Sequence, residues 1–222
     1  MDPTQIEIMG QWFEFCYDAG VHLEPATEMG QKIVDAYSSP KRHYHTLEHI
    51  SHCFFVYDQI PDVIEEDNDL RFAIWFHDFV YDPKLESNES QSAEIAYRWL
   101  QKLDIANPVH VQELIRSTAD YLRPPQGGFA YRILHDVDLA ILASEDEIYR
   151  RYEKGIREEY EHLSDQEFFP ARKKFLHGLL ERRPLFALEA FEHQWERKAR
   201  LNIRQELKRI EKVEILPPTT EK

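Results

Sequence analysis

Glycine is scarce in this chain, with seven residues among 222. A β-rich protein of this length would need more glycines at its turns, so the count favours helices. No stretch alternates apolar and polar residues over any length, and the sequence has neither internal repeats nor low-complexity tracts. Hydrophobic residues make up 42% and charged residues 31%, which is ordinary for a globular protein with a sizeable core.

Positive charge is also in short supply. The chain has 27 lysines and arginines against 41 aspartates and glutamates, which gives a net charge of −14. Such a surface argues against a nucleic-acid polymer or an anionic membrane as the main partner, because both are themselves negative. A small phosphorylated substrate stays compatible, since a bound cation can reverse the local sign of the charge.

Long apolar runs and paired cysteines are missing too. No run approaches the roughly 18 apolar residues that a membrane-spanning helix needs. The opening MDPTQIEIMG has no basic region and no apolar core, so we expect no signal peptide. The two cysteines, Cys16 and Cys53, form no CxxC pair and lie among aromatic residues, which predicts buried free thiols in a reducing compartment. We therefore expect a cytoplasmic protein.

Helical spacing of apolar residues recurs along the whole sequence. It predicts one all-α domain over residues 1–222, with about nine or ten helices. No shift in composition marks a boundary between domains. The motifs lie in a core of about residues 42–143, and further helices are expected over residues 144–213.

Named start signals support several of these helices. One helix is predicted near residues 44–60 and another over about residues 68–80. The expected helix starts are an N-cap at Asn88, the pair Asn107-Pro108, and capping boxes at 144–147 and 164–167.

Four of the eleven histidines lie in one stretch, RHYHTLEHISHC. Residues three and four apart share one face of a helix, so His45, His49 and His52 would form a single stripe, with His43 off it. A solvated polar face gives the same pattern, so the stripe alone leaves a functional site open.

The pair His77-Asp78 is a sharper signal, because it lies inside the apolar run LRFAIWFHDFVYDP. A buried carboxylate must be paired, hydrogen-bonded or ligated, since burying an unpaired charge is expensive. Two interpretations stay open. Either a metal lies between the two side chains, or Asp78 pairs with an arginine such as Arg71 or lies at a helix edge.

A second doublet, His135-Asp136, is followed by Asp138 in RILHDVDLAILAS. The two aspartates point to different sides of a helix, so at most one faces a given site. With this block the sequence resembles the HD superfamily of metal-dependent phosphohydrolases. Four ordered blocks, RHYHTLEHI, FHDFVYDP, NESQSA and DVDLAIL, look like a bacterial group of predicted members over residues 42–143. The resemblance implies an all-α fold and a metal held by His49, His77, Asp78 and Asp138, with Asp136 as the alternative to Asp138.

The segment YHTLEH is also similar to the cyclic-nucleotide phosphodiesterases, in which the histidine four residues ahead of the first metal histidine protonates the leaving oxygen. This resemblance places a catalytic proton donor at His45, whose imidazole titrates near neutral pH, and Asp78 joins it at the catalytic centre. We expect four further residues to support the site or contact substrate: Asn88, Glu89, Ser92 and His52. For Asn88, Glu89 and Ser92 the alternative is plain helix capping.

The sequence offers few ligands for a second metal, because only one histidine, His110, lies between the two His-Asp doublets. The candidates to hold it are Glu89, His110 and Asp120. The cationic residues nearest to the motifs in sequence, and so candidates for holding substrate charge, are Lys41, Arg42, Arg116 and Arg123.

Two histidines and two carboxylates suit Mn²⁺, Fe²⁺, Co²⁺, Ni²⁺ or Zn²⁺, and suit Mg²⁺ less, because Mg²⁺ prefers oxygen ligands. The resemblance implies hydrolysis of a small phosphoester, such as a nucleotide, by metal-activated water. Two alternatives stay open, an HD-fold di-iron oxygenase and a non-catalytic helical scaffold with a structural metal, and so does a homodimer. A ferritin-like bundle is disfavoured because it needs two Glu-x-x-His pairs and the sequence offers one, at Glu159 and His162.

Overall fold

A computed structural model describes residues 3–60 and 67–215 of the chain. These residues form ten α-helices and one 3-10 helix, with no strand among them, which confirms the all-α prediction. The helices are α1 (Pro3–Asp18), α2 (Leu23–Tyr37), α3 (Leu47–Tyr57), α4 (Asn68–Phe76), α5 (Asn88–Leu103), α6 (Pro108–Ser117), α7 (Phe129–Leu139), the 3-10 helix η1 (Ala140–Ala143), α8 (Asp146–Glu159), α9 (Asp165–Glu181) and α10 (Glu189–Ile215). The assignment of the whole chain to one domain stays a prediction.

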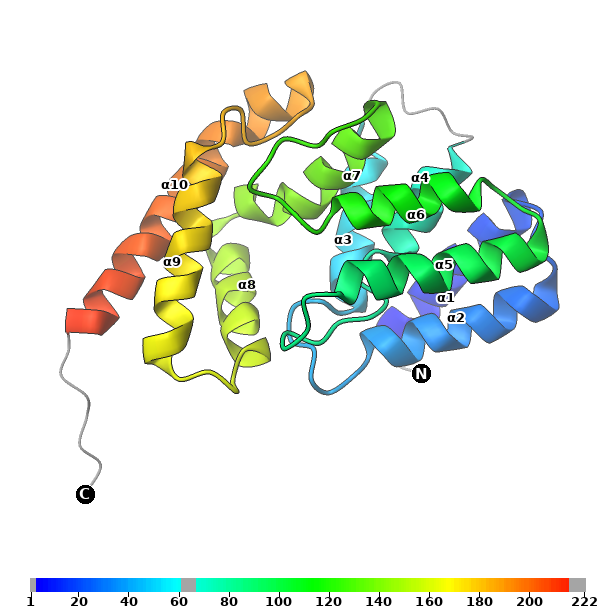
Figure 1. The fold of residues 1–222 in the computed structure, drawn as a ribbon, viewed down its shortest axis with the longest axis horizontal. Coiled ribbons are helices and arrows are strands. Elements are labelled where there is room, and N and C mark those ends of the chain that lie inside the picture. The colour runs from blue at the N-terminus through cyan, green and yellow to red at the C-terminus, as the bar shows by residue number, and fades with distance from the viewer. Residues whose placement is uncertain (1–2, 61–66, 216–222) are drawn as a thin grey trace.

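Helices α3, α4 and α7 pack against one another and carry the motif residues (Figure 1). On one side α1 pairs with α2 and contacts α3, while α5 pairs with α6, which packs on α4 and α7. At the other end of the molecule α8, α9 and α10 lie together, and α10 packs along η1 (Figure 1). The central three helices thus lie between two helical layers.

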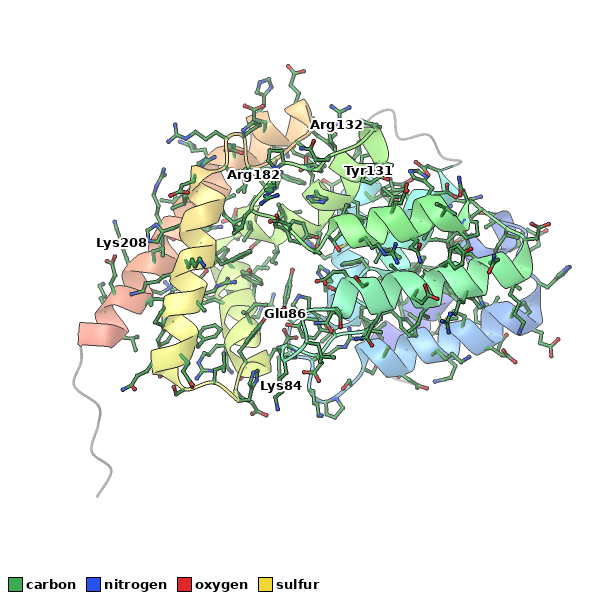
Figure 2. The ribbon with its side chains drawn as sticks, in the orientation of Figure 1. Lys84, Glu86, Tyr131, Arg132, Arg182 and Lys208 are labelled. Atoms are coloured by element: carbon green, nitrogen blue, oxygen red, sulfur yellow. The ribbon has the colours of Figure 1, made fainter. Side chains whose placement is uncertain are left out.

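An aromatic cluster fixes the position of α4. The Trp12 ring lies 5.3 Å from Trp75 and 5.6 Å from Trp99, and both Trp12 and Trp75 are almost fully buried. The Trp12 indole N–H donates to the Ala26 carbonyl at 2.8 Å, so its burial leaves no donor unpaired. Charged side chains such as Lys208 lie on the outside (Figure 2). This packing holds the last turn of α4, where the His-Asp pair follows.

Two helix boundaries differ from the prediction and bear on the site. Helix α3 begins at Leu47 with Thr46 as its N-cap, so His45 lies in the bend before the helix and outside it. Helix α4 ends at Phe76, and the predicted continuation to residue 80 is wrong. The prediction that His45, His49 and His52 share one face of a helix is therefore wrong for His45, which lies outside α3.

Arg42 explains why the chain leaves the helix after α4. Its buried guanidinium donates to the carbonyls of Asp78 and Phe79 at 2.7 and 2.8 Å and to that of His45 at 3.1 Å. The carbonyls of Asp78 and Phe79 lie beyond the last turn of α4 and need partners from outside the helix. One arginine thus ties the segment before α3 to the segment after α4.

The other predicted helix starts have mixed outcomes. Asn107 caps α6 with Pro108 behind it, and the capping box at Ser164 and Glu167 is present, as predicted. The N-cap of α5 is Ser87 and not Asn88, and α8 begins one residue later than the predicted box implies. None of the helices in the described ranges has the length and apolar character needed to cross a membrane.

Candidate metal centre

The structure brings the four predicted metal ligands together. His49 Nε2 lies 3.1 Å from His77 Nε2, 3.2 Å from Asp138 Oδ1 and 3.6 Å from Asp78 Oδ2. His77 Nε2 lies 3.2 Å from Asp78 Oδ2 and 3.8 Å from Asp138 Oδ1. The two imidazoles are buried and the two carboxylates are 14% exposed, so the cluster lies at the floor of an opening.

His77 is oriented toward the cluster by a backbone carbonyl. His77 Nδ1 lies 2.9 Å from the Ile74 carbonyl, which can only accept, so Nδ1 carries a hydrogen and Nε2 is the nitrogen that faces the cluster. A second hydrogen bond of this kind is what fixes the tautomer of a metal-binding imidazole. Asp78 does not pair with Arg71, whose guanidinium instead stacks 4.3 Å from the Phe15 ring.

The spacing of these atoms fits a divalent metal. Two ligand atoms at right angles on a metal with bonds of about 2.1 Å lie about 3.0 Å apart. Burial raises the pKa of Asp78, but the histidines, His77 foremost, outweigh it and hold that pKa well below its ordinary value. Burial also raises the pKa of Asp138, and His77 and His49 lower it to about 2. Two ionised carboxylates and two imidazoles are a donor set that suits a borderline dication.

A cysteine that sequence reasoning placed only in the core also lies at this cluster. Cys53 is buried and free, as predicted, and its sulfur lies 3.7 Å from His49 Nε2. Ligand atoms of His49, Cys53, His77 and Asp138 all lie within 4.8 Å of one another. The available signal was its position four residues after His49, on the same helical face. Asp78 Oδ2 lies 3.6 Å from His49 Nε2 and 3.2 Å from His77 Nε2, and both distances are shorter than the 3.7 Å between the Cys53 sulfur and His49 Nε2.

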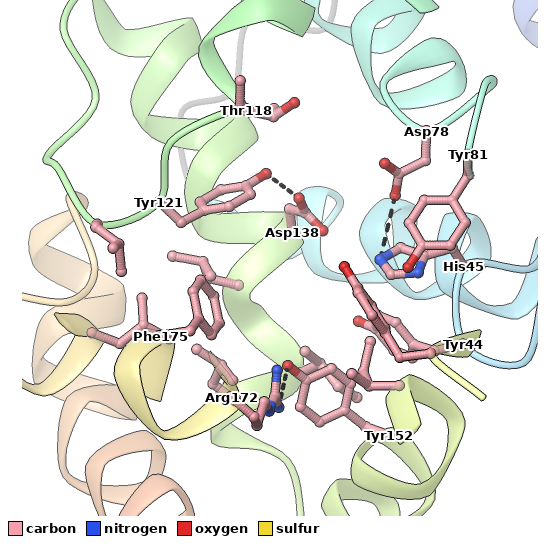
Figure 3. Close-up of a pocket in the computed structure, with 18 of the residues that line it drawn as sticks. Tyr44, His45, Asp78, Tyr81, Thr118, Tyr121, Asp138, Tyr152, Arg172 and Phe175 are labelled. Atoms are coloured by element: carbon pink, nitrogen blue, oxygen red, sulfur yellow. Dashed lines mark hydrogen bonds and ion pairs between the residues drawn. The ribbon is translucent and has the colours of Figure 1, made fainter. Parts of the chain in front are cut away.

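The fallback ligand Asp136 points elsewhere. Its carboxylate accepts hydrogen bonds from the backbone N–H groups of Ala187 and Leu188, at 2.8 and 2.7 Å, and so anchors the segment before α10. Asp138 is the aspartate of α7 that faces the cluster, and its other oxygen accepts a hydrogen bond from the Tyr121 hydroxyl (Figure 3).

His45 lies beside the cluster and is held by a carboxylate from α8. Its Nδ1 lies 2.7 Å from Glu159 Oε2, while its Nε2 faces Asp78 Oδ2 at 3.9 Å. The ring stacks on Tyr81, with centroids 4.1 Å apart, and the Tyr81 hydroxyl donates to the same Glu159 oxygen. Burial lowers the pKa of His45, but Glu159 and Asp78 raise it further, so the net shift is upward.

Glu159 was missed as a functional residue. Its other oxygen, Oε1, accepts the backbone N–H groups of His43, Tyr44 and His45 at 2.8–2.9 Å. Helix α8 can come this close because of Gly155, where a Cβ atom would lie 2.9 Å from the His43 carbonyl oxygen. The sequence carries no local sign of this contact, since 114 residues separate Glu159 from His45.

The predicted supporting residues divide into two groups. Asn88 accepts from the Asp82 N–H and donates to its carbonyl, while the Ser92 hydroxyl accepts from the Val80 N–H, so both hold the loop after the His-Asp pair. Glu89 lines the cavity described below, where burial raises its pKa. His52 lies half-buried on α3, and burial with neighbouring His49 lowers its pKa to about 4.

The candidates for a second metal do not gather. His110 pairs with Asp69 at 2.9 Å, apart from the cluster. Asp120 pairs with exposed Arg123 at 3.3 Å, although it lines the cavity together with Glu89. Of the four cationic candidates, Arg42 is committed to backbone carbonyls, and Lys41, Arg116 and Arg123 are exposed.

A cavity of about 500 Å³ opens onto the cluster (Figure 3). His45, Asp78 and Asp138 lie on one side of it, and residues of η1, α8 and α9 form the opposite wall. Arg172, labelled in Figure 3, belongs to this wall and was not among the sequence candidates. The cavity gives a small molecule access to the cluster.

No protein-family model matches the chain, and neither a curated protein nor a solved structure matches it. What the fold and site establish is a helical protein with a buried cluster of histidine, cysteine and aspartate ligand atoms at metal-binding distance.

Proposed function

We propose that this chain is an HD-type, metal-dependent phosphohydrolase that acts on a small phosphoester. One observation carries the proposal: His49, His77, Asp78 and Asp138 come from three separate elements and converge at the floor of a cavity that also presents His45. A structural metal alone would need neither the cavity nor an oriented imidazole beside it.

The four converging residues would hold one divalent transition metal, with Mn, Fe, Co, Ni or Zn favoured over Mg by the two imidazoles. When bound, such a metal lowers the pKa of a water molecule and polarises a phosphoryl oxygen. Cys53 would pack behind the ligands, because Asp78 Oδ2 lies 3.6 Å from His49 Nε2 and 3.2 Å from His77 Nε2, whereas the sulfur lies 3.7 Å from His49 Nε2.

His45 would donate the proton that the leaving oxygen needs. Glu159 holds its Nδ1–H at 2.7 Å, so the protonated ring presents Nε2–H toward the cavity. Asp78 Oδ2 lies between His77 and His45, where it can orient the hydrogen of an attacking water. Tyr81, stacked on the His45 ring, keeps the imidazole from rotating.

A di-iron oxygenase has less support. It needs further histidine or carboxylate ligands around a second iron, and His110 is paired with Asp69 instead. Glu89 and Asp120 line the cavity but supply no imidazole.

The test separates metal binding from proton delivery. We expect Asp138→Ala to lose bound metal, because the site then keeps one anionic ligand for a dication. We expect His45→Ala to keep its metal and to lose about 10²–10⁴-fold in rate on esters with poor leaving groups, such as alkyl phosphates. On 4-nitrophenyl esters the loss should be much smaller, since that leaving group needs little protonation.

Bound metal is measured by inductively coupled plasma mass spectrometry, and hydrolysis with both ester types. His43→Ala is the matched control, because this exposed side chain pairs with Glu158 and does not line the cavity. Loss of metal in His45→Ala would make His45 a ligand. Retention of metal and full activity in both variants would overturn the proposal.

A further inference from the structure

The wall opposite the metal cluster is mostly apolar and aromatic. It comes from η1, α8 and α9, which follow the motif-bearing core in sequence (Figure 3). Representative residues of this wall are Ile141, Leu142, Tyr152, Ile156, Phe168 and Phe175. A surface of this kind loses unfavourable contact with water when an apolar group covers it.

The charges around the cavity are mainly negative. Asp78, Glu89, Asp120 and Asp138 contribute carboxylates to the lining. In the described part of the chain, Arg172 is the one arginine or lysine that lines the cavity.

That arginine is already neutralised. Its Nε donates to Glu206 Oε1 at 2.7 Å and its Nη2 donates to the Tyr152 hydroxyl at 2.9 Å, with all three side chains buried. Glu206 is held in turn by the Tyr149 hydroxyl at 2.6 Å. A second phosphate away from the metal and His45 would therefore meet the carboxylates of Glu89 and Asp120 and no arginine or lysine free to pair with it, which is unfavourable at low dielectric.

A polar group remains unpaired near the cluster. The Tyr44 hydroxyl is buried and has no hydrogen-bond partner among the residues that the structure describes, and Tyr44 lines the cavity beside His45. Leaving a buried hydroxyl unpaired costs free energy, so an oxygen atom of a bound molecule would be a suitable partner for it.

We infer that the substrate is the ester of a single phosphoryl group with a bulky, apolar alcohol, and not a polyphosphate. This inference rests on the proposed function. The phosphoryl group would lie at the metal cluster within reach of the Tyr44 hydroxyl, and the apolar body would cover the wall of η1, α8 and α9. A volume of about 500 Å³ is enough for a drug-sized organic group.

The experiment measures binding by isothermal titration calorimetry on the metal-loaded full chain. The probes are 1-naphthylphosphonate and methylphosphonate, which cannot be hydrolysed, and inorganic tripolyphosphate. We expect the naphthyl probe to bind about 10–100-fold more tightly than the methyl probe, from burial of its rings. Tripolyphosphate should bind no more tightly than methylphosphonate.

A pair of variants on α9 locates the apolar site. Ala171 is exposed and lines the cavity, so Ala171→Phe should block the wall and bring the naphthyl probe to within about threefold of the methyl probe. Lys174→Phe adds the same ring at an exposed position of α9 outside the cavity and should leave the preference unchanged.

The two levels of the proposal fail differently. Equal binding of both phosphonates, or tighter binding of tripolyphosphate, overturns the apolar substrate class and leaves the phosphohydrolase intact. A preference for the naphthyl probe that survives Ala171→Phe also overturns it. If no phosphonate binds and neither naphthyl phosphate nor methyl phosphate is hydrolysed, the phosphohydrolase itself is overturned.

Discussion

The side chain of Glu159 should be worth more to stability than any other carboxylate at the site. It is fully buried and accepts five hydrogen bonds, three from consecutive backbone N–H groups at residues 43–45, one from His45 Nδ1 and one from the Tyr81 hydroxyl. Burial raises its pKa, but the His45 ring and the backbone N–H groups of Tyr44 and His45 lower it to about 2, so the side chain is ionised near neutral pH.

Glu159→Ala removes all five acceptor contacts. At about 1 kcal/mol for each hydrogen bond, the variant should lose about 5 kcal/mol of unfolding free energy. Since 1 kcal/mol lowers the melting temperature of a chain this size by about 2–4 °C, the expected drop is about 10–20 °C.

Glu159→Gln separates the backbone contacts of this side chain from its contacts to His45 and Tyr81. The amide oxygen can still accept from the three backbone N–H groups, but the amide nitrogen cannot accept from His45 or Tyr81. Both contacts must reverse or break, and both lose a charged acceptor, so the expected cost is at most about 2 kcal/mol and about 4–8 °C. The amide also donates to His45 Nδ1 and imposes the other imidazole tautomer, so hydrolysis of alkyl esters should slow while metal content stays.

The assay is thermal unfolding followed by circular dichroism at 222 nm, together with metal content and rates on both ester types. Tyr81→Phe removes one of the five contacts and should cost about 1 kcal/mol. Glu158→Gln is the control, since the Glu158 side chain is 42% exposed and its ion pairs are worth little. If Glu159→Ala melts no lower than Tyr81→Phe, then Glu159 does not hold the segment before α3.

Three further outcomes follow from the same contacts. Asp136→Asn should lower the unfolding free energy by about 1–3 kcal/mol, because one of the two backbone hydrogen bonds to the carboxylate is lost. This variant should keep its bound metal, and a metal-free variant would contradict the assignment of Asp138 as the last ligand. Cys53→Ala should also keep its metal, and loss of metal on dialysis would make the sulfur a ligand beside His49. Arg172→Met should destabilise the chain by about 3–5 kcal/mol in urea unfolding by leaving Glu206 charged and buried, whereas a loss under about 1 kcal/mol would show that this pair is not buried in solution.

Local signals in the sequence predicted the helices, and the resemblance to the HD superfamily supplied the set His49, His77, Asp78 and Asp138. The few glycines and the helical spacing of apolar residues predicted an all-α fold, and the ten α-helices of the described chain confirm it. The pair His77-Asp78 was recognisable because an apolar run cannot bury an unpaired carboxylate. The same logic marked Asp136 and Asp138, but periodicity could not choose between them, since both belong to one helix turn.

The choice between those aspartates belongs to the tertiary structure. Asp136 faces two backbone amides 51 and 52 residues away, and this contact turns Asp138 toward the histidines. The helix boundaries were misjudged for a related reason. Arg42 captures carbonyls 36 and 37 residues ahead of it and ends α4 early, and no window of local sequence contains that contact.

The second half of the chain shows most plainly which features the sequence determined and which ones the tertiary structure decided. Sequence by itself determined that residues 144–213 are largely helical, through their caps and apolar spacing, but it assigned them no functional residue. Only the tertiary structure brings Glu159 to His45 and lays Arg172 and the apolar wall across from the cluster. The physical reason is range: helix formation depends on neighbours within a few residues, whereas hydrogen-bond partners of a buried group are chosen by packing across the whole chain.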